Sequence, residues 1–515
     1  MVQMLSQVLQ KTSEILSTLP KAETDHFLAS RTLPYPVQKQ LEKFLEKGEA
    51  ILAKAAGYSI VGKRALALIT DRDLYSNTSI LKSLSFTGIR GGLTAVVLEL
   101  FEDIRFFTEK IHTPCIDYDP RKPLTSYVNK VLEYSEASEL PFILRIPLYS
   151  PAHAETETEH VERVSPRPYF NKHWLRPYRW NIIASRTLPK CIEDHKRNIK
   201  ILEKLCEELE LNQLEEKDPK KVAIVSASCS REAPEDETTL ILAFMNPLPK
   251  KTIEELTAKA EKITIVDSGR LYLKEKIRLD KATVKKVEKK YEKTCGGCPF
   301  PYLLYAIAKA LDEINEVGVV CTDTNCHVIT LLTQPDFPEN YQIKSISFFQ
   351  RDFRDIIDIV LSENSAIDIA RAIAEAGYQD GPVIAVTDLY RATQAGKLPP
   401  NLYILAVNTL GAKHGYRKLP SRLDDLIEYL AKIFEAEESH IAVLDKPCPL
   451  AVKIDNNIEL KIDEELCDKC GECLKILCEA ISLEAGKIVL KEEYCRKCGH
   501  CAEICSRNAI VALSP

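Results

Sequence analysis

Glycine is scarce in this chain, which has only 18 glycines among 515 residues, about half of the usual share. Folds that bind diphosphate groups use glycine where the backbone must come close to an oxyanion. A large chain with so few glycines can form few loops of that kind. The composition therefore argues against an intact diphosphate-binding pocket.

The sequence has no long apolar run, and we expect no leader segment. No run approaches the ~20 apolar residues of a membrane-spanning helix, and residues 1–19 show no basic stretch followed by a sustained apolar one. The net charge is −6 and basic residues are spread along the chain, which argues against nucleic acid as a partner. We expect a cytoplasmic globular protein of several domains with no membrane span.

Cysteine, by contrast, is concentrated near the C-terminal end. Two runs share the pattern Cys-x2-Cys-x2-Cys, and a fourth cysteine follows after four or three further residues. Three thiolates at this spacing can bind one cubane iron–sulfur cluster, and the fourth cysteine of each run is placed to bind the other cluster. The spacing therefore predicts two 4Fe–4S clusters, bound by Cys467, Cys470, Cys473 and Cys505 and by Cys495, Cys498, Cys501 and Cys478.

Zinc ribbons and disulfides fit these cysteines less well. Zinc takes four ligands, usually from paired hooks, so a third cysteine two residues further on would be surplus. Disulfides rarely persist in the reducing compartment that we expect for this chain. The proline that often follows the fourth cysteine is replaced by Glu479 in one run and by Ser506 in the other. This change should alter hydrogen bonding near the sulfurs without abolishing ligation.

Apolar strand patterns alternate with helical patterns between residues 40 and 450, which predicts parallel sheets with crossover helices. The expected fold class is α/β, with several parallel-sheet domains and a C-terminal ferredoxin-like α+β module. The expected strands include Leu240–Phe244, Ile343–Phe348, Val383–Val386, Leu402–Val407 and His440–Leu444. We divide the chain into an N-terminal helical segment (1–39), an α/β domain (40–150), a connection and helix (151–219), a small α/β domain (220–280), a larger α/β domain (281–450) and the two-cluster ferredoxin-like module (451–515).

Five segments outside the cysteine runs resemble a known family. Gly62–Leu66 and Thr87–Leu93 resemble its pyrimidine-domain sequence, and Leu140–Arg145 resembles its closing strand. Cys295-Gly-Gly-Cys-Pro299 is similar to its Cys-Pro-Gly-Cys-Pro-His segment, and Lys446-Pro-Cys448 is similar to its Arg-Pro-Cys. With the order of the domains, these segments resemble the large (alpha) subunit of indolepyruvate:ferredoxin oxidoreductase, a thiamine-diphosphate-dependent 2-oxoacid oxidoreductase.

The resemblance implies thiamine-enzyme-like folds for the α/β domains. Residues 40–150 would be pyrimidine-binding-like, 220–280 transketolase C-terminal-like and 281–450 diphosphate-binding-like. In that family the large subunit binds thiamine diphosphate and Mg²⁺, decarboxylates an arylpyruvate and passes electrons through its clusters to ferredoxin. A smaller subunit completes the enzyme, and coenzyme A takes the acyl group.

The chain departs from this family at the positions that thiamine chemistry uses. The Gly-Asp turn of the magnesium site reads Thr-Asp-Leu around Asp388, so the glycine is lost, although Asn408 occupies a plausible slot after the next strand. A hard cation needs several oxygen ligands, and one aspartate in an altered turn provides few of them. The glutamate that activates the cofactor would fall at Gly48, with Glu46 and Glu49 as its neighbours.

Three further positions differ in the same way. The family's Gly-Asp-Ile-Gly-Cys corresponds to Thr322–Cys326, and its histidine after Cys-Pro-Gly-Cys-Pro is Phe300. The family also has a glycine-rich helix. In the corresponding segment of this chain, the glycine positions are taken by Asn364, Asp368 and Ala372. An aspartate facing a diphosphate would repel it. We therefore expect no functional thiamine diphosphate or Mg²⁺ site, and no cofactor-binding residue is assigned there.

Four other cysteines fall in the larger α/β domain. Cys295, Cys298, Cys321 and Cys326 could together hold zinc or a third cluster. The simpler interpretation is that the first two are retained from the family motif and that Cys321 is a buried core thiol. Metal binding by these four cysteines is left open.

Three functions remain as hypotheses. The leading one is an oxidoreductase subunit whose two 4Fe–4S clusters transfer electrons, without thiamine-dependent decarboxylation of arylpyruvates on this chain. The second is a fully active arylpyruvate:ferredoxin oxidoreductase alpha subunit. The third is a pseudoenzyme that acts as a scaffold or iron–sulfur redox sensor. No catalytic residue is assigned. We expect a protein partner, either a small oxidoreductase subunit or another redox protein, with ferredoxin as the electron acceptor.

Overall fold

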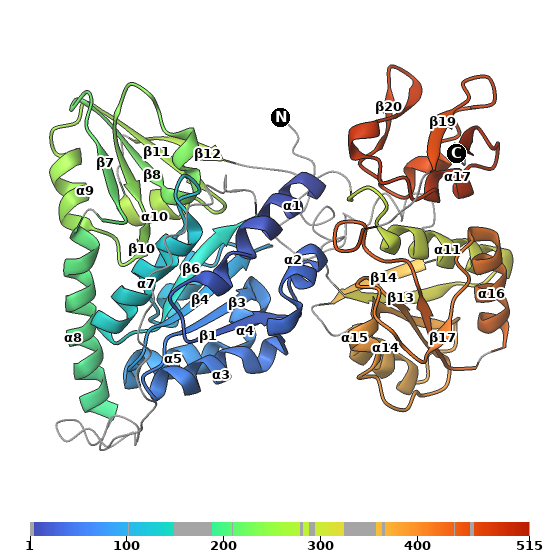
Figure 1. Cartoon of the computed structure of the whole chain (residues 1–515), viewed down its shortest axis with the longest axis horizontal. Helices are drawn as coiled ribbons and strands as arrows, with labels where there is room; N and C mark the ends of the chain where they lie inside the picture. Colours follow the sequence, from blue (N-terminus) through green and yellow to red (C-terminus); the bar gives the residue numbers. More distant parts are fainter. Residues whose placement is uncertain are drawn as a thin grey trace. The chain divides into compact units, whose positions relative to one another are not determined.

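The computed structural model describes residues 5–100, 102–148, 188–208, 210–278, 282–287, 294–323, 357–362, 366–436, 438–453 and 458–513. The chain divides into two compact units (Figure 1). The C-terminal unit comprises Met1–Gln10, Pro34–Lys39 and Lys290–Pro515, and the N-terminal unit comprises Lys11–Leu33 and Gln40–Lys289. Each unit has its own sheets and its own hydrophobic core.

A seven-stranded sheet forms the centre of the N-terminal unit, in the order β10-β5-β6-β4-β3-β1-β2. All of its neighbours pair in parallel except β10, which pairs antiparallel with β5. Strands β3, β4 and β6 are buried along their whole lengths, as is typical of parallel strands covered on both faces. The bounds are β1 His26–Ser30, β2 Leu45–Glu46, β3 Ala65–Thr70, β4 Leu93–Glu99, β5 Cys115–Asp117, β6 Phe142–Pro147 and β10 Phe244–Asn246.

Helices pack against these strands, with α3 against β1 and β3 and α7 against β4 and β6. A second sheet in the same unit has the order β12-β11-β8-β9-β7, and only its edge strand β7 is antiparallel. The helices are α3 Gly48–Ile60, α4 Asp71–Ser76, α5 Thr78–Thr87, α6 Arg105–Lys110, α7 Leu124–Ser138, α8 Leu188–Glu207, α9 Lys250–Thr257 and α10 Tyr272–Ile277. The strands are β7 Gln213–Glu215, β8 Lys221–Ser226, β9 Thr238–Leu242, β11 Lys262–Ser268 and β12 Ala282–Val287.

Two expectations for this unit need correction. The N-terminal segment 1–39 is not simply helical, because it contains β1, which pairs with β3 inside the large sheet. The single strand expected at Leu240–Phe244 is two strands that belong to different sheets. The side chain of Asn212 explains the break, since its Oδ1 accepts hydrogen bonds from the amides of Ala243 and Phe244 at 2.8 and 3.0 Å.

Arg105 is fully buried and ties α6 to the second sheet. Its guanidinium contacts the carboxylates of Asp103 and Asp267 at 2.6 Å each and donates to the carbonyl oxygen of Ser268 at 2.8 Å. A second fully buried arginine, Arg145, links β4, β5 and β6 through two further carboxylates. Buried charges of this kind are tolerated only when each has its partner.

The C-terminal unit contains a six-stranded parallel sheet in the order β14-β13-β15-β16-β18-β17. Helices α11 and α16 pack together beside one apolar face, and α14 packs against β13 and β15. The strands are β13 Gly318–Asp323, β14 Ile357–Ser362, β15 Val383–Asp388, β16 Leu402–Val407, β17 Arg417–Lys418 and β18 His440–Leu444. The helices are α1 Leu5–Leu16, which starts in this unit, α2 Tyr35–Gln40, α11 Pro299–Glu313, α14 Ala366–Glu375, α15 Leu389–Ala392 and α16 Leu423–Glu435.

The cysteine-rich module at the end of this unit has two antiparallel ribbons, β19 with β22 and β20 with β21. Its apolar residues belong to the same core as α11 and α16, so the module and the six-stranded sheet share one interior. The bounds are β19 Glu459–Ile462, β20 Ile481–Glu484, β21 Lys487–Leu490, α17 His500–Ile504 and β22 Ile510–Leu513. These sheets confirm the predicted α/β class with several largely parallel sheets.

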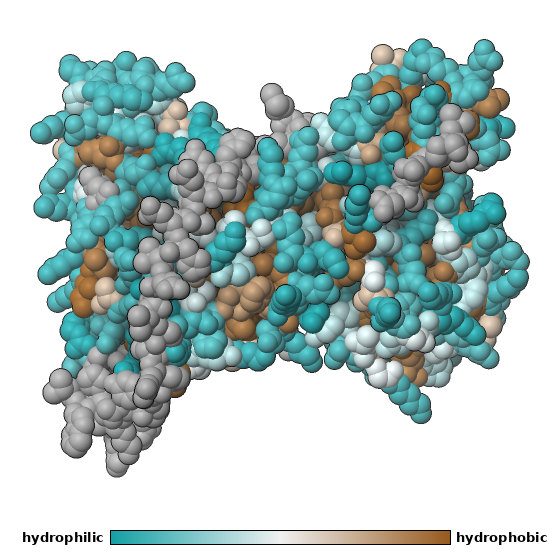
Figure 2. Space-filling model, in the orientation of Figure 1, coloured by the Kyte–Doolittle hydropathy of each residue, from teal (hydrophilic) through white to brown (hydrophobic). Residues whose placement is uncertain are grey.

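The face drawn in Figure 2 is mostly hydrophilic, with hydrophobic residues in small separate groups. In the parts of the chain that the structure describes, no helix is both long enough and apolar enough to cross a membrane. The expected strand Ile343–Phe348 lies outside the described residues.

Replacing Arg105 should destabilise the N-terminal unit. We expect Arg105→Ala to lower the free energy of unfolding by about 3–5 kcal/mol, because two buried carboxylates would lose their partner. Lys220→Ala is the matched control, since its ion pair with Glu261 has side chains that are 67% and 70% exposed and should contribute less than about 1 kcal/mol. Urea unfolding measures both variants, and equal losses would contradict the expectation.

Candidate functional site

The four cysteines predicted to bind the first cluster line one cavity. Cys467, Cys470, Cys473 and Cys505 all border it. Cys505 belongs to the second cysteine run, and the fold brings it beside the first three. Cys470 is exposed, whereas Cys473 is buried. This set therefore reaches from the core of the module to its surface.

The four cysteines predicted to bind the second cluster line another cavity. Its border includes Cys478, Cys495, Cys498 and Cys501, and Cys478 comes from the first run. The charge of Cys473, a member of the first set, contributes to the raised pKa of Cys501. The two sets are therefore neighbours. Both cavities thus contain the crossed fourth cysteine that the spacing predicts.

The two cysteine loops share one backbone shape. Each reads Cys-x-Lys-Cys-Gly-x-Cys, and its lysine and glycine are both left-handed. The φ angles are 63° at Lys469 and 81° at Gly471, and 53° at Lys497 and 80° at Gly499. Left-handed turns of this kind can aim N–H groups into a concave anion site. Accordingly, the Lys497 amide donates to Sγ of Cys495 at 3.4 Å.

Burial favours the protonated form of three of these thiols. The pKa values of Cys473 and Cys498 are raised to about 12, mainly by burial and also by the charges of neighbouring cysteines. Burial and neighbouring cysteines also raise the pKa of Cys501. Because iron binds the thiolate form, assembly of the predicted clusters at these cavities would release protons.

A largely buried cation lies beside the second set. The ammonium group of Lys446 is 4.0 Å from the ring centroid of Tyr302 and 3.8 Å from the carboxylate of Glu503. Its positive charge partly opposes the rise that burial causes in the pKa of Cys498. Burial, assisted by Lys446, lowers the pKa of His500 well below its ordinary value, so that imidazole is neutral near pH 7. A cation at this place favours the more negative, reduced state of a cluster.

Glu479, at the position where a proline is common, forms a buried junction. Its Oε1 accepts a hydrogen bond from the Gly296 amide at 3.0 Å, and its Oε2 accepts one from the Ser6 amide at 3.3 Å. Its own amide donates to the carbonyl oxygen of Thr294 at 3.0 Å. The carboxylate therefore joins α1 and the loop before α11 to the backbone next to Cys478.

The loop before α11 lies directly against the second cysteine set. A Cβ added at Gly297 would lie 3.3 Å from Cβ and 3.4 Å from Sγ of Cys498. Burial raises the pKa of Cys478, and hydrogen bonds from the amides of Ala480 and Gly297 lower it. Gly297 is left-handed, with φ of 76°, so glycine suits both the conformation and the contact.

The residues at the positions of the family's magnesium site are bonded to other parts of this chain. Asp388 ends β15 and caps α15, where its Oδ1 accepts from the Arg391 amide at 3.0 Å. Its Oδ2 pairs with the Arg391 guanidinium at 2.6 Å. Asn408 donates to the carbonyl oxygen of Ala412 and to Asp445 and accepts from the Ala412 amide. Neither side chain is thus arranged as a cation ligand, and the site does not fit Mg²⁺.

The positions of the family's glutamate and histidine are occupied by Gly48 and Phe300, and both are closely packed. At Gly48 an added Cβ would lie 2.0 Å from Oδ1 of Asp73, so a larger residue there would require the Asp73 side chain to move. Glu46 is paired with Lys54 at 2.6 Å. Phe300 is buried and stacks on Tyr35, with ring centroids 6.0 Å apart.

Two further motifs of the family correspond to segments of this chain that the structure describes only in part. Asp368 and Ala372 are exposed on α14. Thr322 is buried, and its hydroxyl has no hydrogen-bond partner among the described residues. Asp323 ends β13, whereas Thr324, Asn325, Cys326 and Asn364 lie outside the described residues.

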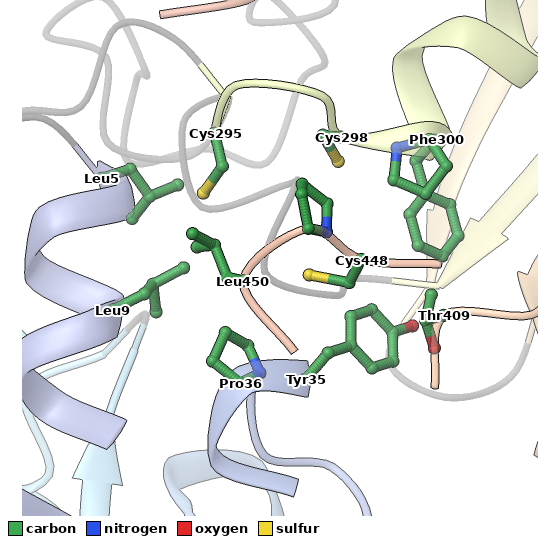
Figure 3. Close-up of a pocket in the computed structure, with 12 residues that line it drawn as sticks. Leu5, Leu9, Tyr35, Pro36, Cys295, Cys298, Phe300, Thr409, Cys448 and Leu450 are labelled. Carbon is green, nitrogen blue, oxygen red and sulfur yellow. The ribbon is translucent and has the colours of Figure 1, made fainter. Parts of the chain in front are cut away.

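Cys321 does not join Cys295 and Cys298. It is fully buried in β13, among the residues that pack on the α14 side of the sheet. The partner that the fold supplies instead is Cys448, which lines one cavity with Cys295 and Cys298 (Figure 3). Sequence reasoning missed this grouping because Cys448 lies far along the chain. The only signal was its place in the Lys446-Pro-Cys448 motif.

In the described part of the chain, no three Cys, His, Asp or Glu side chains are arranged to hold a single metal ion.

Substitution at Gly297 should disturb the second cysteine set. Gly297→Ala places a methyl group against Cys498, and we expect it to shift the EPR spectrum and midpoint potential of the cluster predicted at this set. Gly486→Ala is the control, because φ there is 75° and an added Cβ meets nothing within 4 Å. Backbone strain should lower the free energy of unfolding of both variants by about 1–2 kcal/mol. Equal spectra for the two variants would contradict the expected contact.

No protein-family profile matches the chain. Two solved structures resemble parts of it. A 2-oxoglutarate:ferredoxin oxidoreductase from Magnetococcus marinus, with 2-oxoglutarate, coenzyme A and succinyl-CoA bound, is 14% identical, with a TM-score of 0.40 over 56% of this chain and 62% of that one. A split-gene transketolase, an inactive beta4 tetramer, is 12% identical, with a TM-score of 0.32 over 55% and 88% of the two chains.

Curated proteins named indolepyruvate oxidoreductase subunit IorA are 20% identical to this chain. The match to the protein of Archaeoglobus fulgidus covers 53% of this chain and only about half, 54%, of that protein. The match to Methanothermobacter marburgensis covers 89% of this chain and 88% of the relative. The match to Methanothermobacter thermautotrophicus covers 91% and 89%. In sequence, therefore, the chain resembles the indolepyruvate oxidoreductase subunit IorA along about nine-tenths of its length.

Proposed function

We propose that this chain is an electron-transfer subunit of an oxidoreductase and binds two 4Fe–4S clusters. The observation that carries the proposal is the pair of neighbouring cavities: one is bordered by all four cysteines of the first set and the other by all four of the second set, and each set includes the crossed fourth cysteine. Cys467, Cys470, Cys473 and Cys505 would bind the first cluster. Cys495, Cys498, Cys501 and Cys478 would bind the second. When bound, each cluster can accept and pass on one electron.

The residues around the cavities support this role. Backbone amides point at several sulfurs, among them the Ala509 amide, which donates to Sγ of Cys505 at 3.2 Å. Hydrogen bonds to the sulfurs and nearby charges set the potential of a cluster. Apolar residues such as Ile476 and Ile481 border the second cavity and limit the access of water.

The exposure of the cysteines supports a direction for the transfer. Cys470 is exposed, whereas Cys501 of the second set is buried. The first cluster would then exchange electrons with a partner protein, either ferredoxin or a small oxidoreductase subunit. The second cluster would connect it to the interior of the C-terminal unit.

Thiamine-dependent decarboxylation on this chain is not part of the proposal. Asp388 is paired with Arg391, the Asn408 amide is satisfied by its neighbours, and the glutamate slot at Gly48 is blocked by Asp73. Each change removes a group that binding or activating the cofactor requires. The chain would move electrons in an assembly whose other members perform the chemistry.

A second candidate function is a fully active arylpyruvate:ferredoxin oxidoreductase alpha subunit. It is favoured by the names of the curated relatives that match nearly the whole chain. Under this alternative, the segments around Asp388 and Asn408 would have to rearrange to bind Mg²⁺ and thiamine diphosphate.

Removal of one cluster ligand should remove one cluster. We expect Cys470→Ala and Cys498→Ala, purified without oxygen, each to lose about four iron atoms per chain relative to the unsubstituted protein. Cys115→Ala is the control, because Cys115 is a fully buried thiol of the N-terminal unit. Iron analysis with EPR spectroscopy checks the result. Undiminished iron in both cluster variants would overturn the ligand assignment.

Calorimetric titration distinguishes the two candidate functions. We expect no saturable binding when thiamine diphosphate and Mg²⁺ are added to the iron-loaded chain. The same titration with Mg²⁺ and inorganic pyrophosphate controls for simple anion binding. Saturable binding of thiamine diphosphate, together with reduction of the clusters by an arylpyruvate, would favour the active enzyme instead.

A further inference from the structure

Helix α11 presents two tyrosines to the cysteine-rich module. Tyr302 and Tyr305 are three residues apart, so they lie on the same face of the helix, and both are buried. The Tyr302 hydroxyl donates a hydrogen bond to the carboxylate of Glu503. The Tyr305 hydroxyl donates to Oε2 of Glu472 at 2.9 Å. One helix is therefore joined to the module by two tyrosine–carboxylate bonds.

Each carboxylate belongs to one of the two cysteine runs. Glu472 stands between Cys470 and Cys473 and borders the cavity of the first set. Glu503 stands on α17, two residues after Cys501 of the second set. The two bonds therefore connect α11 to the backbone that supplies ligands to each predicted cluster.

The charge that reaches the second set is positive. The ammonium group of Lys446 lies 4.0 Å from the ring centroid of Tyr302, and its side chain is only 15% exposed. It interacts electrostatically with Cys498. Glu503 partly offsets this charge and is fixed by the amide of Leu423, at the start of α16, at 2.9 Å. The ring and the carboxylate together hold the cation beside the sulfur, where partial burial strengthens its field.

The charge that reaches the first set is negative. Glu472 pairs with Lys475 at 2.7 Å, and both side chains are largely buried, but only the carboxylate borders the cavity. The other charged residues on this border are Asp468, Lys469 and Arg507. All three are exposed, so water and salt screen their charges. Glu472 is thus the least screened charge on the border of the first set.

Charges and hydrogen bonds near a cluster set its reduction potential. We propose that α11, through Tyr302 and Tyr305, holds Lys446 and Glu472 as positioning residues that set the potentials of the two clusters separately. Lys446 raises the potential of the second cluster, and Glu472 lowers that of the first. Both effects favour an electron on the second cluster. The inference rests on the proposed two-cluster function and deepens it, because it names the groups that control where the electron resides.

A redox titration of the full-length, iron-loaded protein, followed by EPR, tests Lys446. In Lys446→Met, reduction of the second cluster should become about tenfold less favourable, which lowers its midpoint potential by about 59 mV. The first cluster should not change. Lys446→Arg keeps the charge and should restore most of the potential. Lys432→Met is the control, because that side chain is 68% exposed and should move neither potential. The spectra of Cys470→Ala and Cys498→Ala assign the two signals.

The same titration tests Glu472 with the opposite sign. Glu472→Gln keeps an acceptor for the Tyr305 hydroxyl and removes the charge, so reduction of the first cluster should become about tenfold more favourable. The second cluster should not change. Glu464→Gln is the control, because Glu464 is exposed. Glu503→Gln removes the anion beside Lys446 and should raise the potential of the second cluster, which gives an independent measurement if Lys446→Met loses iron.

Three results would overturn the proposal. The first is full iron with an unmoved second-cluster potential in Lys446→Met and Glu503→Gln. The second is an unmoved first-cluster potential in Glu472→Gln. The third is an equal shift of both clusters in either charge variant, which would show a general change in structure. Fewer than about eight iron atoms in the unsubstituted protein would reject the proposed function itself, whereas full iron with unmoved potentials rejects this inference alone.

Discussion

The close approach of the Gly296–Gly297 backbone to the second cysteine set is the constraint on which the C-terminal unit depends. A Cβ at Gly296 would lie 2.3 Å from the carbonyl oxygen of Tyr494, so a larger residue would force the loop and the module apart. Through this contact the loop before α11 receives Glu479, supplies an amide to Cys478 and holds Cys295 and Cys298 at the shared border of two cavities. In a chain with few glycines, two consecutive ones stand where a protein loop, and not a diphosphate, comes close.

The edge of the six-stranded sheet where a ligand would be expected is closed by the protein itself. Parallel sheets commonly bind ligands at the carboxyl ends of their strands, and here that edge is closed by internal bonds. Asp445, after β18, accepts from Asn408 and pairs with His414 and Lys418 at 2.8 Å each. Burial raises its pKa, but these hydrogen bonds and charges bring it down to about 2 overall. The carboxylate is thus stable as a fixed part of the loop, and the polar groups that could have faced a cofactor support the fold.

The sequence predicts local features of this protein well and distant pairings poorly. Spacing alone indicates which cysteines share a cavity, because a Cys-x2-Cys-x2-Cys loop can place its sulfurs around one point; ligation itself stays a prediction. The buried strands β15, β16 and β18 follow from continuous apolar runs. The union of Cys448 with Cys295 and the transfer of β10 to the large sheet depend on packing between segments far apart in sequence. The bond from Asn212 that separates β9 from β10 uses a side chain whose role no pattern reveals.

The hydrogen bond between the Ser6 amide and Glu479 joins residues 473 positions apart. Closing such a long stretch of chain costs conformational entropy, and contacts between residues far apart in sequence slow folding. The junction at Glu479 forms only when α1 and the segment that carries Cys478 have come together. The backbone beside Cys478 thus keeps its place through a contact with a helix far away in the sequence.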